Sequence, residues 1–124
     1  MTINNPSAFV ASLWDWAILD GCFGNTNIRP TDIDGLVERN GRFLYLETKL
    51  PGTATNEGQE RTWASLVETK RFAVLLIWGY PGHPVSARLL FDGQVIEYDP
   101  CDIDKLREIV KRWYAYADKT KLAA

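Results

Sequence analysis

The chain has 124 residues, of which 46% are hydrophobic and 12% aromatic, a composition that is typical of one globular domain and excludes a disordered segment. Its formal net charge of −2 lacks the basic excess of most sequence-independent nucleic-acid binders, although a group of metal-binding carboxylates would lower the total by itself. The longest apolar run, residues 72–78, is too short to cross a bilayer. We therefore expect one domain over residues 1–124 and no membrane partner.

Two features favour a cytoplasmic protein. The first residues, MTINNPSAF, lack the basic start and the apolar stretch of a signal peptide. Cys22 and Cys101 are the only cysteines and have no CxxC spacing, so we expect two reduced thiols, with a single disulfide as the alternative.

The first predicted element is a helix over residues 7–20. Ser7 is a suitable N-cap, and apolar side chains recur at helical spacing at Phe9, Leu13, Trp16 and Ala17. The turn-rich stretch that follows has room for a short strand between residues 22 and 28.

Two strands are predicted next, over residues 32–39 and 42–50, because Asn40-Gly41 between them favours a type I′ hairpin turn. A helix over residues 57–70, a buried strand in RFAVLLIWGY and a loop at PGHP follow. The chain then forms a second hairpin that turns at Asp92-Gly93, and a last helix that begins near Asp102. This order predicts an α/β sandwich around a mixed sheet.

The two-residue turn fixes which residues of the first hairpin face each other. It places Asp34 opposite Glu47 in a non-hydrogen-bonded pair, with Cα atoms about 4.5 Å apart, and Asp32 opposite Lys49. Two carboxylates at that separation repel, so we expect a shared proton, a neighbouring cation such as Lys49, or a bound Mg²⁺ to compensate. An exposed sheet face with ordinary ion pairs is the alternative, but the same face carries apolar residues that indicate a cover: Leu36, Phe43 and Tyr45.

Asp34, the hairpin and the tripeptide Glu47-Thr48-Lys49 resemble the D…(D/E)xK signature of PD-(D/E)xK nucleases, which include restriction enzymes, Holliday-junction resolvases and phage exonucleases. The stretch PTDIDG with a downstream GQ is similar to small phage and prophage nucleases of this superfamily. The resemblance covers residues 7–79. It implies a restriction-endonuclease-like αβββαβ core with a mixed central sheet flanked by helices, to which this chain adds a C-terminal β-hairpin and helix.

The resemblance also implies a site. Asp34 and Glu47 would bind Mg²⁺, for which Mn²⁺ would substitute, with the backbone carbonyl of Thr48 as a further ligand. Lys49 would orient or deprotonate the attacking water. Gln59 matches the glutamine that several branches place on the helix after the motif; the alternative is a polar residue that merely begins a helix.

Other polar residues have two interpretations each. Asp32 is either a salt-bridge partner of Lys49 or an additional metal ligand. Asp15, or Asp20, is a candidate for the acid that many family members place on the first helix, and a solvated helix-face aspartate is the alternative. His83 is the only histidine, and in PGHP we expect it on a surface loop.

The sequence thus predicts a Mg²⁺-dependent deoxyribonuclease, located in the host cytoplasm if phage-encoded. A chain of this size has no separate recognition domain, so specificity would come from a homodimer, a partner protein or the structure of the DNA. One alternative is a catalytically inactive nuclease-fold module that binds nucleic acid or protein. The other is a structural or regulatory α/β domain whose acidic hairpin end is coincidental.

Overall fold

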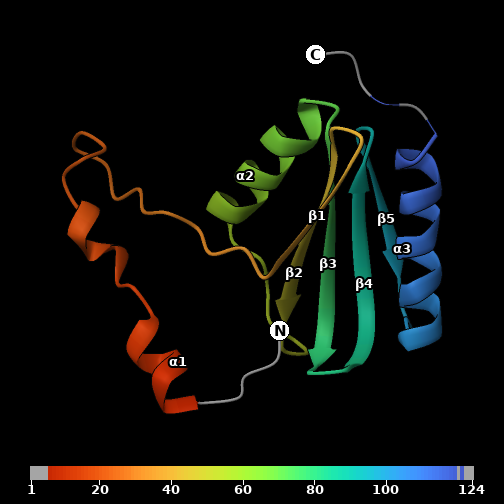
Figure 1. The fold of residues 1–124 in the computed structure, drawn as a ribbon, viewed down its shortest axis with the longest axis horizontal. Coiled ribbons are helices and arrows are strands. Elements are labelled where there is room, and N and C mark those ends of the chain that lie inside the picture. The colour runs from red at the N-terminus through yellow and green to blue at the C-terminus, as the bar shows by residue number, and fades with distance from the viewer. Residues whose placement is uncertain (1–5, 120, 122–124) are drawn as a thin grey trace. The chain divides into compact units, whose positions relative to one another are not determined.

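The computed structural model describes residues 6–119 and 121, which belong to two compact units, Met1–Asp32 and Ile33–Ala124 (Figure 1). The single domain predicted over residues 1–124 stays a prediction. The first five residues, on which the expectation of no signal peptide partly depends, lie outside the described residues. Over the described ranges, no helix has the length and apolar character needed to span a membrane.

The first unit contains two short helices where the sequence predicts one. Helix α1 spans Pro6–Ser12, and the 3-10 helix η1 spans Trp16–Leu19. The continuous helix over residues 7–20 is therefore wrong, and so is the N-cap at Ser7. The reason is local: the Asp15 carboxylate accepts a hydrogen bond from the Ala17 amide at 2.9 Å, which begins a new helix instead of continuing the first.

After η1, residues 20–32 form turns and irregular backbone. The short strand expected between residues 22 and 28 does not form in this described stretch. Neither α1 nor η1 buries a side chain, so the apolar stripe predicted for this helix does not face a core within the unit.

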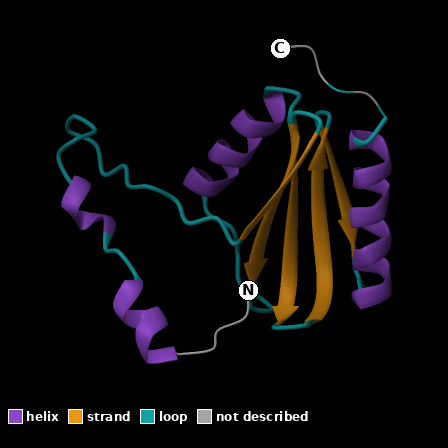
Figure 2. Ribbon diagram, in the orientation of Figure 1, coloured by secondary structure: helices purple, strands orange, loops and turns teal. Residues whose placement is uncertain are grey.

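The second unit is a five-stranded mixed sheet in the order β1-β2-β3-β4-β5, with α2 on one face and α3 on the other (Figure 2). Strands β2 and β3 run parallel because α2 connects them, and every other neighbouring pair is antiparallel. This arrangement confirms an α/β class with a mixed sheet. The elements are β1 (Gly35–Arg39), β2 (Arg42–Lys49), α2 (Glu57–Glu68), β3 (Phe72–Tyr80), β4 (His83–Phe91), β5 (Gln94–Tyr98) and α3 (Ile103–Ala117).

Both predicted hairpins form with the predicted turns. Asn40 and Gly41 have φ of 55° and 82°, as a type I′ turn requires, and the register from Arg39 opposite Arg42 to Gly35 opposite Leu46 is confirmed. The second hairpin turns at Asp92-Gly93. Strand β1, however, begins at Gly35 and not at residue 32, so the ladder ends one pair short of Asp34 and Glu47.

A third hairpin joins β3 to β4 where the sequence predicts a loop over PGHP. His83 already belongs to β4 and pairs with Tyr80, which leaves Pro81-Gly82 as the two-residue turn. Gly82 has φ of 77°, the positive value that the second central residue of a type II turn requires, and proline is common at the first. A β-bulge at Trp78/Gly79 precedes the turn.

Strand β3 separates two hydrophobic cores, which confirms that both its faces are covered. Alternate residues such as Leu75 pack toward α3, while Val74 and Leu76 pack toward α2. The same alternation divides β2. Its buried Tyr45 faces α2, so Glu47 and Lys49 are directed to that side as well.

Candidate active site

The candidate residues gather where the parallel strands β2 and β3 end. Glu47 lies beside Leu76 and Lys49 beside Trp78 in the parallel register. In open α/β sheets, ligands bind in the crevice outside the carboxyl ends of parallel strands. The end of β2 therefore suits a binding site on grounds that do not depend on any sequence motif.

Asp34 is bound to the end of β2 through Thr48. Its Oδ2 accepts the Thr48 amide at 2.7 Å and the Thr48 hydroxyl at 3.1 Å. In the continued ladder, that amide would donate to the backbone carbonyl of Ile33. The carboxylate takes the place of this carbonyl, so Asp34 is held at the sheet edge and does not form a strand pair with Glu47.

This contact also shows to which side the Thr48 backbone carbonyl points. In an extended strand, the N–H and the C=O of one residue point to the same side, and the Thr48 N–H points to Asp34. The Thr48 carbonyl, the Asp34 Oδ1 and the Glu47 carboxylate are hard oxygen donors of the kind that Mg²⁺ accepts alongside water and substrate phosphates. The donor set therefore fits a Mg²⁺ ion. Over residues 6–119 and 121, the structure contains no group of three or more His, Cys, Asp or Glu side chains arranged to bind a metal.

Tyr45 lies on the same face of β2 as Glu47. Its hydroxyl and the Oε2 of Glu47 are both shielded from solvent. Burial raises the pKa of Tyr45, and the negative charges of Glu47 and then Asp34 raise it further. Tyr45 and Glu47, two residues apart on β2, therefore place a hydroxyl and a carboxylate oxygen on the face toward α2, both shielded from solvent. The sequence pattern placed Tyr45 on the charged face but did not identify it as part of the site.

Lys49 is held by the beginning of α2. Its Nζ donates to the Oε1 of Gln59 at 3.2 Å. Gln59 is also the third residue of a capping box: its amide donates to the Asn56 Oδ1 at 2.8 Å, and its Oε1 accepts the Asn56 amide at 3.4 Å. Both interpretations of Gln59 therefore apply at once, since it begins the helix and contacts the amine of Lys49.

A second cation, which the sequence did not single out, lies on the same face. The Arg88 guanidinium stacks over the Trp78 ring at 5.2 Å and pairs with Glu97, its Nε 2.5 Å from Oε1. Trp78 in turn donates its indole N–H to the carbonyl of Thr53 at 2.8 Å. This contact fastens the β2–α2 loop beside Lys49.

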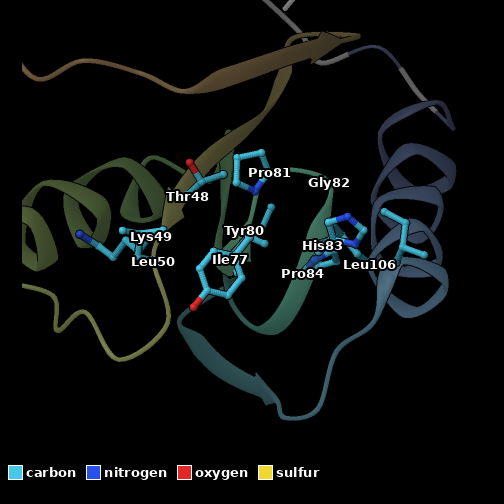
Figure 3. A pocket seen from close by; sticks show the side chains of 12 residues that line it. Thr48, Lys49, Leu50, Ile77, Tyr80, Pro81, Gly82, His83, Pro84 and Leu106 are labelled. Carbon is cyan, nitrogen blue, oxygen red and sulfur yellow. The ribbon is translucent and has the colours of Figure 1, made fainter.

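The opposite face of the same sheet end contains a pocket of about 430 Å³ (Figure 3). Its walls are the end of β2 at Thr48, the tip of the β3–β4 hairpin, and the first turn of α3. In Figure 3 the amine of Lys49 points away from this pocket toward α2, whereas Tyr80 and His83 extend beside it from the hairpin.

The remaining candidate acids belong to the first unit. Asp15 caps η1 and does not lie mid-helix, which corrects the position expected for it. Asp20 binds Arg29 through two hydrogen bonds of 2.9 and 2.7 Å. Asp32 is exposed. Metal roles for Asp15 and Asp32 stay predictions.

Comparison of the chain with protein-family models, with curated proteins and with solved structures gave no match. The relation to PD-(D/E)xK nucleases therefore stays a resemblance in sequence.

Proposed function

We propose that the chain is a metal-dependent nuclease that hydrolyses phosphodiester bonds in DNA, with a restriction-endonuclease-like fold. One observation carries the proposal: at the end of β2, the Thr48 amide binds the Asp34 carboxylate, and the amine of the next residue, Lys49, is held by the helix-capping Gln59. Phosphodiester hydrolysis requires acidic oxygens to bind a cation and a basic group near the attacking water.

Each residue has a role in this proposal. Asp34 and Glu47 would bind Mg²⁺ or Mn²⁺ together with the Thr48 carbonyl. When bound, the ion lowers the pKa of its water and neutralises charge on the phosphate. Lys49 would orient or deprotonate the attacking water, and its amine would also attract the scissile phosphate. Gln59 fixes the position of the amine through the 3.2 Å hydrogen bond.

The first test is cleavage of plasmid, linear, single-stranded and branched DNA with Mg²⁺ or Mn²⁺. Glu47→Gln should lower the cleavage rate by about 100-fold or more, because it removes a charge from the cation site. Glu57→Gln is a matched control, since the Glu57 side chain is 89% exposed at the beginning of α2. Absence of cleavage on every substrate with either metal would contradict the proposal.

The second test concerns Lys49. Lys49→Ala should lower cleavage while the Mg²⁺-dependent rise in melting temperature remains, because the carboxylates are intact. Lys111→Ala, on the exposed surface of α3, is its control. Activity that survives both Glu47→Gln and Lys49→Ala would place the reaction elsewhere on the molecule.

A catalytically inactive module that binds nucleic acid or protein is the second candidate. The observation that favours it is that Asp34 and Lys49 already make hydrogen bonds within the protein, to Thr48 and Gln59. DNA binding without cleavage, unchanged by Mg²⁺, would support this candidate. A homodimer or a partner protein that supplies specificity also stays a prediction, and sedimentation of the purified chain tests the homodimer.

A further inference from the structure

The pocket beside Thr48 has the size and lining of a small-ligand site. At about 430 Å³ it falls in the range of pockets that bind small molecules, and most of its wall is apolar. Ile77 of β3 and Leu106 of α3 supply apolar side chains to its lining (Figure 3). Tyr80 is 61% exposed at its edge, a large aromatic ring that no core covers.

The hairpin that carries Tyr80 is held in one conformation. A Cβ atom at Gly79 would overlap the His83 carbonyl oxygen and lie 2.8 Å from the Pro84 Cα, so the two backbones are in closest contact here. Pro81 restricts the turn, and Gly82 supplies the positive φ that it needs. The ring of Tyr80 therefore extends from a strand residue that pairs with His83, and not from an unpaired loop.

The pocket and the candidate active site share the end of β2. Thr48 and Lys49 both line the pocket, and the Thr48 amide and hydroxyl bind Asp34 at the sheet edge. A nucleic-acid strand with a phosphate at Lys49 would therefore have a neighbouring base within reach of the pocket. Apolar walls and an exposed aromatic ring match the faces of a base, which all four bases have in common.

We infer that this pocket binds one unpaired nucleobase next to the scissile phosphate, with Tyr80 as the stacking residue. This inference rests on the proposed function. A base in a duplex is stacked on its neighbours and cannot enter, so the substrate is single-stranded or has a frayed or splayed end at the cleaved position. Specificity then comes from the strand's structure and not from its sequence.

Fluorescence anisotropy tests the inference with two labelled strands of equal length: a strand of about 12 thymidines, within the site sizes of single-strand binders, and the same backbone with abasic residues throughout. The wild-type protein should bind the thymidine strand more tightly by about fivefold or more, the stacking contribution of one base. Tyr80→Ala should abolish this difference, and Tyr80→Phe should keep it. Tyr114→Ala, which removes an exposed tyrosine from α3, should also keep it.

Equal binding of both strands by the wild type, or no binding of either, would overturn the inference. So would a preference that persists in Tyr80→Ala with an unchanged melting temperature. Cleavage, measured separately, distinguishes this failure from failure of the proposed function. If Glu47→Gln abolishes cleavage but the preference for the thymidine strand does not depend on Tyr80, the proposed nuclease function is supported and the base-binding pocket is rejected. If the preference depends on Tyr80 but no substrate is cleaved, base binding in the pocket is supported and the proposed nuclease function is rejected.

Discussion

A single oxygen of Asp34 accepts both the backbone amide and the side-chain hydroxyl of Thr48, at 2.7 and 3.1 Å. The side chain thereby replaces the last rung of the β1–β2 ladder. Hydrogen bonds to a carboxylate are stronger than those between neutral groups, so the acid is held in place before any ligand arrives. The residue that holds it is the same one whose carbonyl would complete the proposed metal site.

The substitution Asp34→Asn separates charge from structure. The amide side chain that it introduces keeps an oxygen for the Thr48 amide, so we expect the variant to fold with a melting temperature near that of the wild type. Its Mg²⁺-dependent cleavage should fall by about 100-fold or more, because one anionic ligand is lost. Thr48→Val removes only the hydroxyl contact and should cost about 1 kcal/mol of unfolding free energy or less, with cleavage within a few fold of wild type. Similar losses of cleavage in both variants would contradict this assignment.

The parts of the fold that could be predicted from the sequence are those that neighbouring residues determine. Asn40-Gly41 can form a type I′ turn on its own, and the turn then sets the register as far as Gly35. The contact of Asp34 with Thr48 could not be predicted, because a side chain there displaces a backbone carbonyl and ends the strand. The helix break at Asp15 could not be predicted for the same reason. The apolar spacing predicts one long helix, in which the Ala17 amide would bond to a backbone carbonyl, but the Asp15 carboxylate accepts that amide instead.

Gln59→Ala should lower both stability and catalysis. The substitution removes one half of the capping box and the hydrogen bond to Lys49, so we expect a loss of about 1 kcal/mol and a reduced kcat with little change in KM. Thermal unfolding and steady-state kinetics measure the two effects.

Asn56→Ala is the matched control for Gln59. It removes the other half of the capping box and should also lower the unfolding free energy by about 1 kcal/mol. The side-chain Oε1 of Gln59 still accepts the hydrogen bond from the Lys49 amine. We expect kcat to be preserved in this variant. An equal loss of kcat in both variants would mean that Gln59 acts only through the stability of α2.

The first hairpin is tied to the end of α3 by Asn40, which donates its side-chain amide to the Ala117 carbonyl at 3.1 Å. Asn40→Ala loses this bond. It also places alanine at φ of 55°, a left-handed backbone conformation that asparagine tolerates better because its polar side chain can form local hydrogen bonds. We expect a loss of about 1–3 kcal/mol in denaturant unfolding. Asn40→Gly loses the bond but tolerates the backbone, so it should be milder. A milder effect from alanine would contradict the strain argument.

Two glycines should respond to alanine in opposite directions. At Gly79 the added methyl would overlap the His83 carbonyl oxygen, so the β3–β4 hairpin must shift, at a cost of about 1–3 kcal/mol or more. At Gly58, inside α2, the nearest atom is the Asn56 Oδ1 at 3.5 Å, an ordinary contact. Gly58→Ala should therefore stabilise the protein by up to about 1 kcal/mol through helix propensity. Thermal melts of both variants test the pair, and stabilisation by Gly79→Ala would show that the hairpin is not packed as described.

The two cysteines should react with a thiol reagent at very different rates. Cys22 is exposed, whereas Cys101 is fully buried in the core next to α3, and both are free thiols. Burial, with a smaller effect from the charge of Asp102, raises the pKa of Cys101, so its thiolate fraction at neutral pH is lower than that of an exposed cysteine. An aromatic disulfide reagent should therefore modify one thiol rapidly in the native protein and the second only after denaturant is added. Cys22→Ser should remove the rapid phase alone. Two rapid phases in the native protein would mean that the core around Cys101 opens readily to solvent.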